Sequence, residues 1–467
     1  MGLKKSMRWL VMSCMALLSG CATNSLFSPY PTQVAEIKQQ IAAGDFAAAR
    51  KALEKKSQGP DKMLYLMERG RIAQIAGDTE ASIQDFEQVL AEFEAKEEAA
   101  KISATGAAGK AGAVLLNENA IPYAGSAYER IFVHSFQALN YLWADNLEAA
   151  GVEARRANLE QQLALQANED EVERAEAQES AEETVILQQN PDYRRKFSSL
   201  TRLSSKVKNA IQNGYSFYLS GLIYEISGEY NDAYIDYKKA LEIYPTNHYL
   251  RQDVLRLARK LGMDEDLERF SQVEVREDVA RSAKDEGRLV VLYEQGYVPE
   301  KHEVNIVVDL RGVPNNLVFP TYFDRARPNR PLVIGLSGRR LGETETIAEP
   351  AAMAARELEE QLTGMIVRQG LRAIAREQLK DNQMNSTFGI LAGIGQLLLN
   401  RADLRSWLTL PAEVQLLDAM VSAGKQRLTL RNGVQSKAIT VDVQPGRITI
   451  VHVIAVSGQL HARTITI

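Results

Sequence analysis

Histidine, cysteine, serine and carboxylate side chains carry most enzyme chemistry, and here their spacing matches no catalytic pattern. None of the histidines pairs with another, or with a carboxylate, at the spacing of metal ligands. Residues 335–338 (GLSG) lack the Gly-x-Ser-x-Gly nucleophile turn. The Gly/Ala-rich stretch 105–112 has only two residues between Gly106 and Gly109-Lys110, whereas a phosphate-binding loop needs four. We therefore expect no enzyme, no metal site and no cofactor. The five histidines are His134, His248, His302, His452 and His461.

Two weaker chemical readings stay open. A carboxylate pair for glycoside hydrolysis need not be close in sequence, so a hydrolase is the weakest functional hypothesis. His452 and His461 fall on adjacent expected strands, where we expect a plain surface pair.

Cys21 is the residue with the clearest chemical role. Three cations precede an apolar run at 9–18, and Leu18-Ser19-Gly20 leads directly into the cysteine. This order is typical of a secretory signal, and the last four residues resemble the lipobox of bacterial lipoproteins. We expect a signal peptide at 1–20, lipidation of Cys21 and a tether at 21–32. The cations are Lys4, Lys5 and Arg8.

The sorting signal that follows the cysteine predicts the membrane. In that lipoprotein class an aspartate after the cysteine retains the protein in the inner membrane, and here the residue is Ala22. The resemblance implies an outer-membrane lipoprotein that faces the periplasm and contacts the membrane through its N-terminal lipid.

Charge and cysteine content exclude several classes of protein. The only cysteines are Cys14 and Cys21, so a chain cut before Cys21 has no disulfide. Removal of the three signal-peptide cations leaves 52 basic against 60 acidic residues, a net charge of −8. A chain with this balance has no overall attraction for nucleic acid.

The elements that must position any site begin with helical repeats. Residues 215–245 resemble a tetratricopeptide repeat, which is a pair of antiparallel helices. Small residues at 221, 233 and 240 let two helices approach, and aromatic residues at 224, 230 and 237 fill the gap between neighbouring pairs. Pro245 ends the second helix. Weaker copies lie near 63–94 and 131–162, so we predict a self-supporting helical solenoid at 33–270.

From about residue 285 the hydrophobic period changes from 3.6 to 2. Residues 288–296, 303–310 and 331–338, and five short segments after Pro411, read as strands separated by Gly-containing turns. We predict an α+β chain whose C-terminal domain, 285–467, is an antiparallel β-sandwich with a helical insertion at about 350–405. The apolar stretch 384–400 is expected to be buried, with shallow membrane insertion as the alternative.

Two segments carry candidate binding residues in the β-rich region. One is 293–301, with Tyr293 and Lys301, and the other is 401–413, with Asp403, Arg405 and Trp407. Two readings are open. In the first, Asp403 and Arg405 form an ion pair while Trp407 plugs the junction between the helical insertion and the sandwich. In the second, the two segments form a partner-binding corner.

The concave face of the solenoid is the other candidate surface. Repeat stacks curve, and the first helix of each pair lines the inner groove. The residues expected there are Phe136, Asn140, Tyr215, Tyr218 and Glu225. The alternative is that these side chains pack on the next pair or on the C-terminal domain.

Most of the mature chain resembles a family of uncharacterised proteobacterial outer-membrane lipoproteins with tetratricopeptide-like repeats. The resemblance rests on 128–156, on 221–245, on VVLYEQGYVPEK and on ADLRSWLTLPAE. It implies a non-enzymatic scaffold that binds an envelope protein. The family also resembles lipoproteins that activate peptidoglycan synthases, which implies a role in envelope assembly. The rival hypothesis is a peptidoglycan- or carbohydrate-binding module in the β domain.

Overall fold

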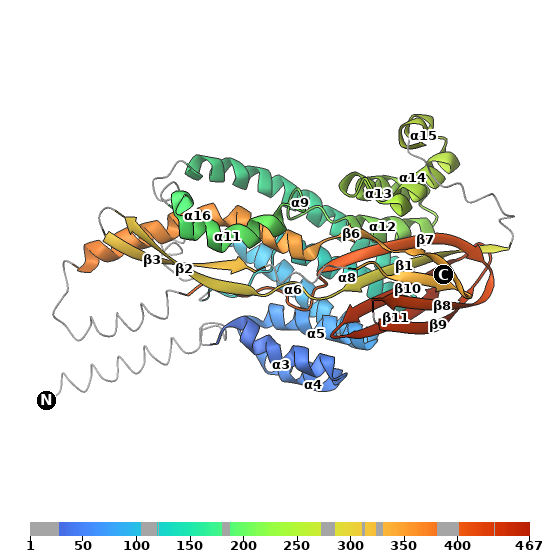
Figure 1. Cartoon of the computed structure of the whole chain (residues 1–467), viewed down its shortest axis with the longest axis horizontal. Coiled ribbons are helices and arrows are strands. Elements are labelled where there is room, and N and C mark those ends of the chain that lie inside the picture. Colours follow the sequence, from blue (N-terminus) through green and yellow to red (C-terminus); the bar gives the residue numbers. More distant parts are fainter. Residues whose placement is uncertain are drawn as a thin grey trace.

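The computed structural model describes residues 28–103, 119, 121–179, 187–271, 285–310, 313–323, 330–380, 401–433 and 435–467. The predicted signal peptide, Cys21 and the stretch 384–400 lie outside these residues. Figure 1 shows the helices of the first half of the chain lying against the strands of the second half. Among the described residues, no helix combines the length and the apolar character that crossing a membrane requires.

The helices of the first half follow one another as antiparallel pairs. The pairs are α3/α4, α5/α6, α8/α9, α12/α13 and α14/α15, with α11 and a short 3-10 turn, η1, between them. Their bounds are α3 Tyr30–Ala42, α4 Phe46–Glu54, η1 Lys56–Gln58, α5 Lys62–Ala76, α6 Thr79–Ser103, α8 Ala127–Trp143, α9 Leu147–Glu179, α11 Pro191–Ser204, α12 Gly214–Ile226, α13 Tyr230–Ile243, α14 His248–Leu261 and α15 Asp264–Ser271.

The pair α12/α13 shows how the sequence specifies a repeat. The Asn213 side chain accepts a hydrogen bond from the Ser216 amide and so caps the start of α12. Gly228 makes the turn with a φ of 81°, a conformation that suits glycine. At Gly221 a Cβ atom would lie 2.8 Å from the Tyr237 ring, so only glycine allows the two helices to approach this closely. The expected role of position 221 is confirmed, whereas the Tyr237 ring packs within its own helix pair, against Gly221 and Tyr218, rather than between neighbouring pairs.

The strands form two larger sheets and a hairpin. One sheet has the order β11-β10-β1-β7-β6, another has the order β5-β4-β8-β9, and β2 pairs with β3. The bounds are β1 Glu286–Gln295, β2 Lys301–Leu310, β3 Val313–Tyr322, β4 Val333–Leu336, β5 Arg339–Glu343, β6 Glu345–Ala348, β7 Glu413–Ser422, β8 Gly424–Asn432, β9 Gln435–Val443, β10 Ile448–Val456 and β11 Gln459–Thr466.

The predicted fold class, α+β with a helical first part and a largely antiparallel β domain, is confirmed. One strand pair departs from the expected antiparallel arrangement, because β1 and β10 run parallel with Leu292 opposite His452. Parallel neighbours need a long connection. Here the whole of 296–447 separates them, and this stretch includes α16 (Pro350–Lys380).

The first described helix begins earlier than expected. α3 starts at Tyr30, inside the segment predicted as a tether, with Pro31 in its first turn. The Tyr30 side chain is fully buried, and its hydroxyl donates a hydrogen bond of 2.9 Å to Glu68 on α5. Because this contact fixes the residue to the next repeat, the chain is already structured here.

Candidate functional site

The inner face of the helical repeats contacts the β domain of the same chain. On α12, the Tyr218 hydroxyl donates a hydrogen bond of 2.8 Å to Asp418 on β7. On α14, Asp253 accepts a hydrogen bond of 2.6 Å from Arg288 on β1. In Figure 1 strands of the five-stranded sheet pass in front of α8 and beside α12. One continuous hydrophobic core includes residues from both halves.

Arg288 lies at the centre of this interface. Its guanidinium group forms ion pairs with Glu225 at 2.6 Å, with Asp253 at 2.6 Å and with Asp418 at 2.5 Å. Burial opposes the charge of Glu225, but Arg288 and Arg256 outweigh it and lower the pKa of Glu225 to about 2. Glu225 is therefore a structural carboxylate of the interface.

The chain at 405–409 runs between helices of the repeats. Glu129 on α8 accepts a hydrogen bond of 2.8 Å from the Trp407 amide. Glu68 on α5 accepts hydrogen bonds from the amides of Leu408 at 2.8 Å and Thr409 at 3.0 Å. Two buried carboxylates of the repeats thus hold an irregular segment from the β-rich region, which turns at residues 408 and 409.

Trp407 fills the space between two repeats. Its ring makes edge-on contacts with Phe86 of α6 and Phe136 of α8, with centroids 5.9 and 5.8 Å apart. The sequence placed this plug between the helical insertion and the sandwich, and that location is wrong. The tryptophan enters the helical stack because the rings of Phe86 and Phe136 pack against it there.

The expected ion pair of Asp403 and Arg405 is present, with a nitrogen–oxygen distance of 2.6 Å. Arg405 also binds Asp61 at 2.7 Å and donates to the Ile121 carbonyl at 2.8 Å. Lys301 donates a hydrogen bond of 3.1 Å to the Arg405 carbonyl. The structure therefore brings the segments 293–301 and 401–413 together, as the corner hypothesis requires, but directs their main side chains inward.

The expectation that the inner groove is open to a partner is wrong for this set of side chains. Four of the five groove residues have no exposed surface, and Glu225 is occupied by Arg288 and Arg256. Tyr293 and Trp407 of the corner segments are also fully buried, and Arg405 is nearly so. Tyr218 and Phe136 are covered by Asp418 and Trp407 of the β-rich region. Asn140 and Tyr215 instead pack against neighbouring helices of the repeats, as the alternative reading expected. The fully buried groove residues are Phe136, Asn140, Tyr215 and Tyr218.

His452 also differs from its expected surface position. It is buried, its ring stacks on Trp143, and its Nε2 lies 2.6 Å from Glu294, which pairs in turn with Arg71 of α5. Burial and the nearby Arg71 lower its pKa well below the ordinary value. His461 lies opposite Ile454 rather than His452, so the two histidines do not pair. Within the described ranges, no group of three His, Cys, Asp or Glu residues is placed to hold a metal ion.

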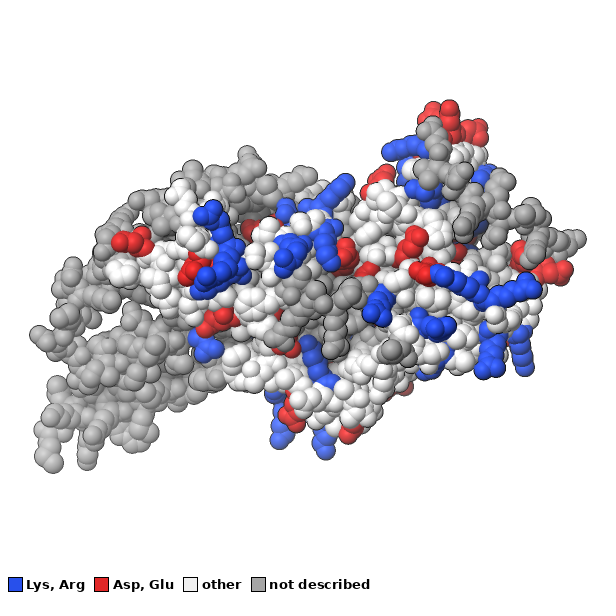
Figure 2. Space-filling model, in the orientation of Figure 1, with Lys and Arg blue, Asp and Glu red and all other residues white. Residues whose placement is uncertain are grey.

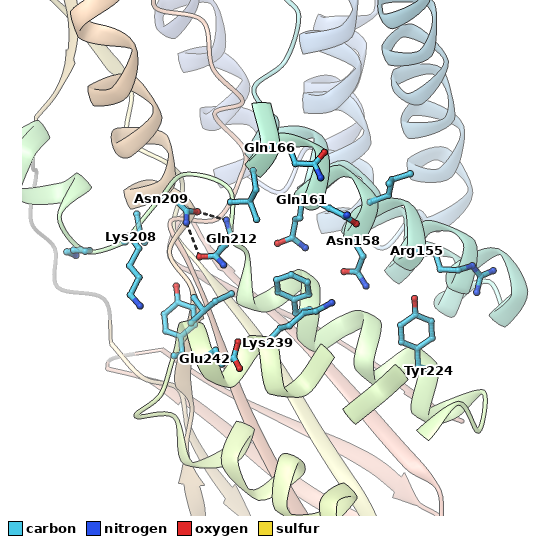
Figure 3. Close-up of a pocket in the computed structure, with 18 residues that line it drawn as sticks. Arg155, Asn158, Gln161, Gln166, Lys208, Asn209, Gln212, Tyr224, Lys239 and Glu242 are labelled. Carbon is cyan, nitrogen blue, oxygen red and sulfur yellow. Dashed lines mark hydrogen bonds between the residues drawn. The ribbon is translucent and has the colours of Figure 1, made fainter. Parts of the chain in front are cut away.

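A pocket on the outer side of the repeats is open to a ligand. It has a volume of about 950 Å³ and lies between α9, the loop at 206–212, and the pair α12/α13. Figure 3 shows Asn158 and Gln161 extending from α9 toward the gap, with Tyr224 on the opposite wall. We call this cavity the outer pocket.

Carboxamides and cations dominate the outer pocket. Six of its lining residues are asparagine or glutamine, and four are lysine or arginine against one glutamate. Burial raises the pKa of Tyr224 to about 12, so its hydroxyl is neutral. Sequence analysis did not find this site, although the amide-rich surface of 158–166 was a usable signal. The carboxamides are Asn158, Gln161, Gln162, Gln166, Asn209 and Gln212, and the cations are Arg155, Lys206, Lys208 and Lys239.

Comparison with known proteins identifies one repeat. Residues 215–247 match the tetratricopeptide repeat family. This range covers nearly all of the pair α12/α13. Among curated proteins, none matches the chain. A crystal structure of MamA shares 13% identity over 50% of this chain and 89% of that one, with a TM-score of 0.28. The complex of the TPR2AB domain of yeast Sti1 with pHSP90 shares 12% identity over 51% and 87%, with a TM-score of 0.21.

Proposed function

We propose that this protein is a non-enzymatic adaptor that binds a protein partner through the outer side of its helical repeats. The observation that carries the proposal is the contrast between the two faces of the repeats. The inner face is filled by the β domain, whereas the outer pocket is open and lined by groups that form hydrogen bonds. Tetratricopeptide repeats stack helix pairs into extended surfaces that suit protein contacts.

We further propose that the adaptor is a periplasmic lipoprotein of the outer membrane, anchored through Cys21, and that its partner is an envelope protein with a role in envelope assembly. The charged, apolar and small residues at 1–20 support this location. A Cys21→Ser variant should lose metabolic lipid labelling and the processed form. Normal lipid labelling of that variant would exclude the anchor.

Site-specific photocrosslinking in cells tests where the partner binds. A photoreactive residue at Leu159, which lines the outer pocket and is 55% exposed, should give one discrete crosslinked species. The matched control is Val307 on β2, which is 63% exposed and lies on a different element. Crosslinking to the same species from Val307 alone would show that the outer pocket is not the binding surface.

A second candidate function is favoured by the charge on one sheet. On β8 the side chains of Lys425, Arg427 and Arg431 are exposed, whereas Leu428 and Leu430 between them are buried. Figure 2 shows basic side chains over the end of the molecule where β7, β8 and β9 lie. Such a face fits the carboxylates of peptidoglycan stem peptides.

Sedimentation with isolated peptidoglycan distinguishes this second candidate. The protein should co-sediment at low salt, and replacing the three β8 cations by glutamine should abolish co-sedimentation. If the triple variant sediments like the wild type, the β8 face does not bind the polymer.

A further inference from the structure

The outer pocket presents one hydrogen-bond acceptor and one donor whose directions are fixed by the protein. Asn158 donates through Nδ2 to Asp236 at 2.6 Å, and this bond sets which side of the amide carries Oδ1. Gln161 accepts at Oε1 from the Asn213 amide at 2.8 Å, which leaves Nε2 on the other side. The Asn158 Oδ1 and Gln161 Nε2 atoms are buried and have no hydrogen-bond partner within the described part of the chain.

Asn158 and Gln161 are three residues apart on one helix and line the same pocket. Side chains at this spacing are neighbours, with Cβ atoms about 5–6 Å apart. In an extended peptide the N–H and C=O of one residue point to the same side and bond together to a facing strand. An acceptor beside a donor on α9 is the complement of that pair of backbone groups.

Polar groups that lack partners are costly when buried, with a free-energy cost of about 1–3 kcal/mol each. The Gln161 side chain belongs to a residue that is only 1% exposed, and it lines the pocket. A ligand that supplies one donor and one acceptor would remove both costs at once. The structure therefore contains a preformed backbone-recognition element in the outer pocket.

The charges around this element select the side chains of the ligand. Lys239 pairs with Asp236, and Lys206 lies 3.5 Å from Glu349. Arg155 and Lys208 are exposed, and no ion pair within the described residues neutralises them. Glu242 is the one acidic residue among the lining side chains. A ligand with carboxylates is favoured over a neutral or basic one.

The length of the pocket along α9 sets the length of the ligand. The lining residues on this helix extend from Arg155 to Gln166. At about 1.5 Å per residue this helical stretch is about 16 Å long. An extended peptide covers that distance with about five residues.

We propose that the outer pocket binds a short, extended, acidic peptide segment of the partner protein. Asn158 and Gln161 bind one residue's backbone, and Arg155 and Lys208 bind carboxylates that flank it. This inference rests on the proposed adaptor function and names the chemistry that the adaptor recognises.

Fluorescence polarisation with the full chain from residue 21 tests the proposal. The probe is a fluorescein-labelled, amidated hexapeptide of alternating glutamate and alanine, and the comparison peptide carries glutamine for glutamate. We expect saturable binding of the acidic probe, weakened about tenfold or more with the glutamine peptide or in Arg155→Ala. Arg156→Ala is the matched control, because Arg156 is 47% exposed, pairs with Glu153 and does not line the pocket.

Gln161→Glu tests the backbone-recognition element separately. This variant keeps the oxygen that accepts from the Asn213 amide but replaces the free donor by a carboxylate oxygen, so probe binding should be lost. Because a buried carboxylate also lowers the melting temperature, binding is measured well below the thermal transition and circular dichroism checks that the fold is intact. Unchanged binding in Gln161→Glu or Arg155→Ala, or equal binding of the glutamine peptide, would overturn the proposal. Binding of an N-acetylglucosamine tetramer with no binding of the acidic probe would also overturn it.

Crosslinking at Leu159 tests the proposed adaptor function independently of the peptide-binding experiment. If Leu159 still crosslinks to a partner in cells while the acidic probe fails to bind, the adaptor function stands and the peptide chemistry is wrong. If neither binding nor crosslinking is observed, both proposals fail.

Discussion

Arg288 joins β1 to two helices of the repeats and to β7, and its charge is almost completely buried. Removing one partner from a buried ion cluster leaves the remaining charges uncompensated, at a cost of about 3–5 kcal/mol. We expect Arg288→Met to lower the free energy of unfolding by that amount in urea denaturation. The control is Arg427→Met on the exposed face of β8, which should change it by less than about 0.5 kcal/mol. Similar small losses in both variants would show that the cluster does not stabilise the interface.

Glu225 should make stability depend on pH in the acid range. Its pKa is about 2 in the folded protein, against about 4.3 in an unfolded chain. The unfolded state therefore binds more protons between these values, and the stabilisation by Glu225 is complete above about pH 4.5 and lost as the pH falls toward 2. Glu225→Gln should reduce the slope of unfolding free energy against pH between 5 and 3, whereas Glu148→Gln, an exposed change on α9, should not. Parallel profiles for wild type and Glu225→Gln would contradict this assignment.

Local contacts between side chains could be predicted from sequence, but contacts between distant segments could not. Asp403 and Arg405 are two residues apart, and their charge and spacing were enough to predict their ion pair. The pairing of Arg405 with Asp61 joins residues 344 positions apart, and nothing in the periodicity of either segment indicates it. The same holds for Arg288, whose three acidic partners come from three different elements.

The repeat α12/α13 was predictable because its signals are local. Tyr237 packs against Gly221 and is fully buried, and its hydroxyl donates a hydrogen bond of 3.0 Å to Glu225. Tyr237→Ala should cost about 3–5 kcal/mol of unfolding free energy, as expected for loss of a large buried ring. Phe323→Ala is the comparison, since this ring is 39% exposed. A melting temperature unchanged by Tyr237→Ala would mean that the ring is not part of the repeat core.

The strands that sequence analysis missed have no clear alternation. β3 contains Pro314 and Pro320 and the pair Asn315-Asn316, which are unfavourable in strands. It pairs with β2 in a two-stranded sheet, and at the edge of a sheet a proline without an amide hydrogen is tolerated. β5 and β6 are short, with five and four residues, so hydrophobic period alone could not identify them.

The two halves of the chain share one hydrophobic core, which the sequence did not indicate. Each half has its own periodicity, so the helical part was expected to be self-supporting. In the structure the inner face of α5, α8 and α12 is covered by the segment at 405–409 and by strands β1 and β7. The core is continuous across this boundary. Hydrophobic periodicity and composition indicate which face of a helix or strand is apolar. They cannot show which distant segment covers that face.

Separating the two halves tests whether the helical repeats need the β domain to fold. A fragment of residues 28–271 would uncover Phe136 and Tyr218 and would leave the carboxylates of Glu68 and Glu129 without the amides of 407–409. We expect this fragment alone to bind a hydrophobic dye and to lack a cooperative thermal transition, because large exposed apolar faces and unpaired buried charges both destabilise it. Coexpression with residues 285–467 should restore a complex with a single cooperative transition. The control is coexpression with 285–467 carrying Trp407→Ala, which removes the ring between Phe86 and Phe136 and should weaken the complex. A cooperative transition of the 28–271 fragment by itself, with no dye binding, would show that the repeats are an independent domain and that the β domain only rests on them.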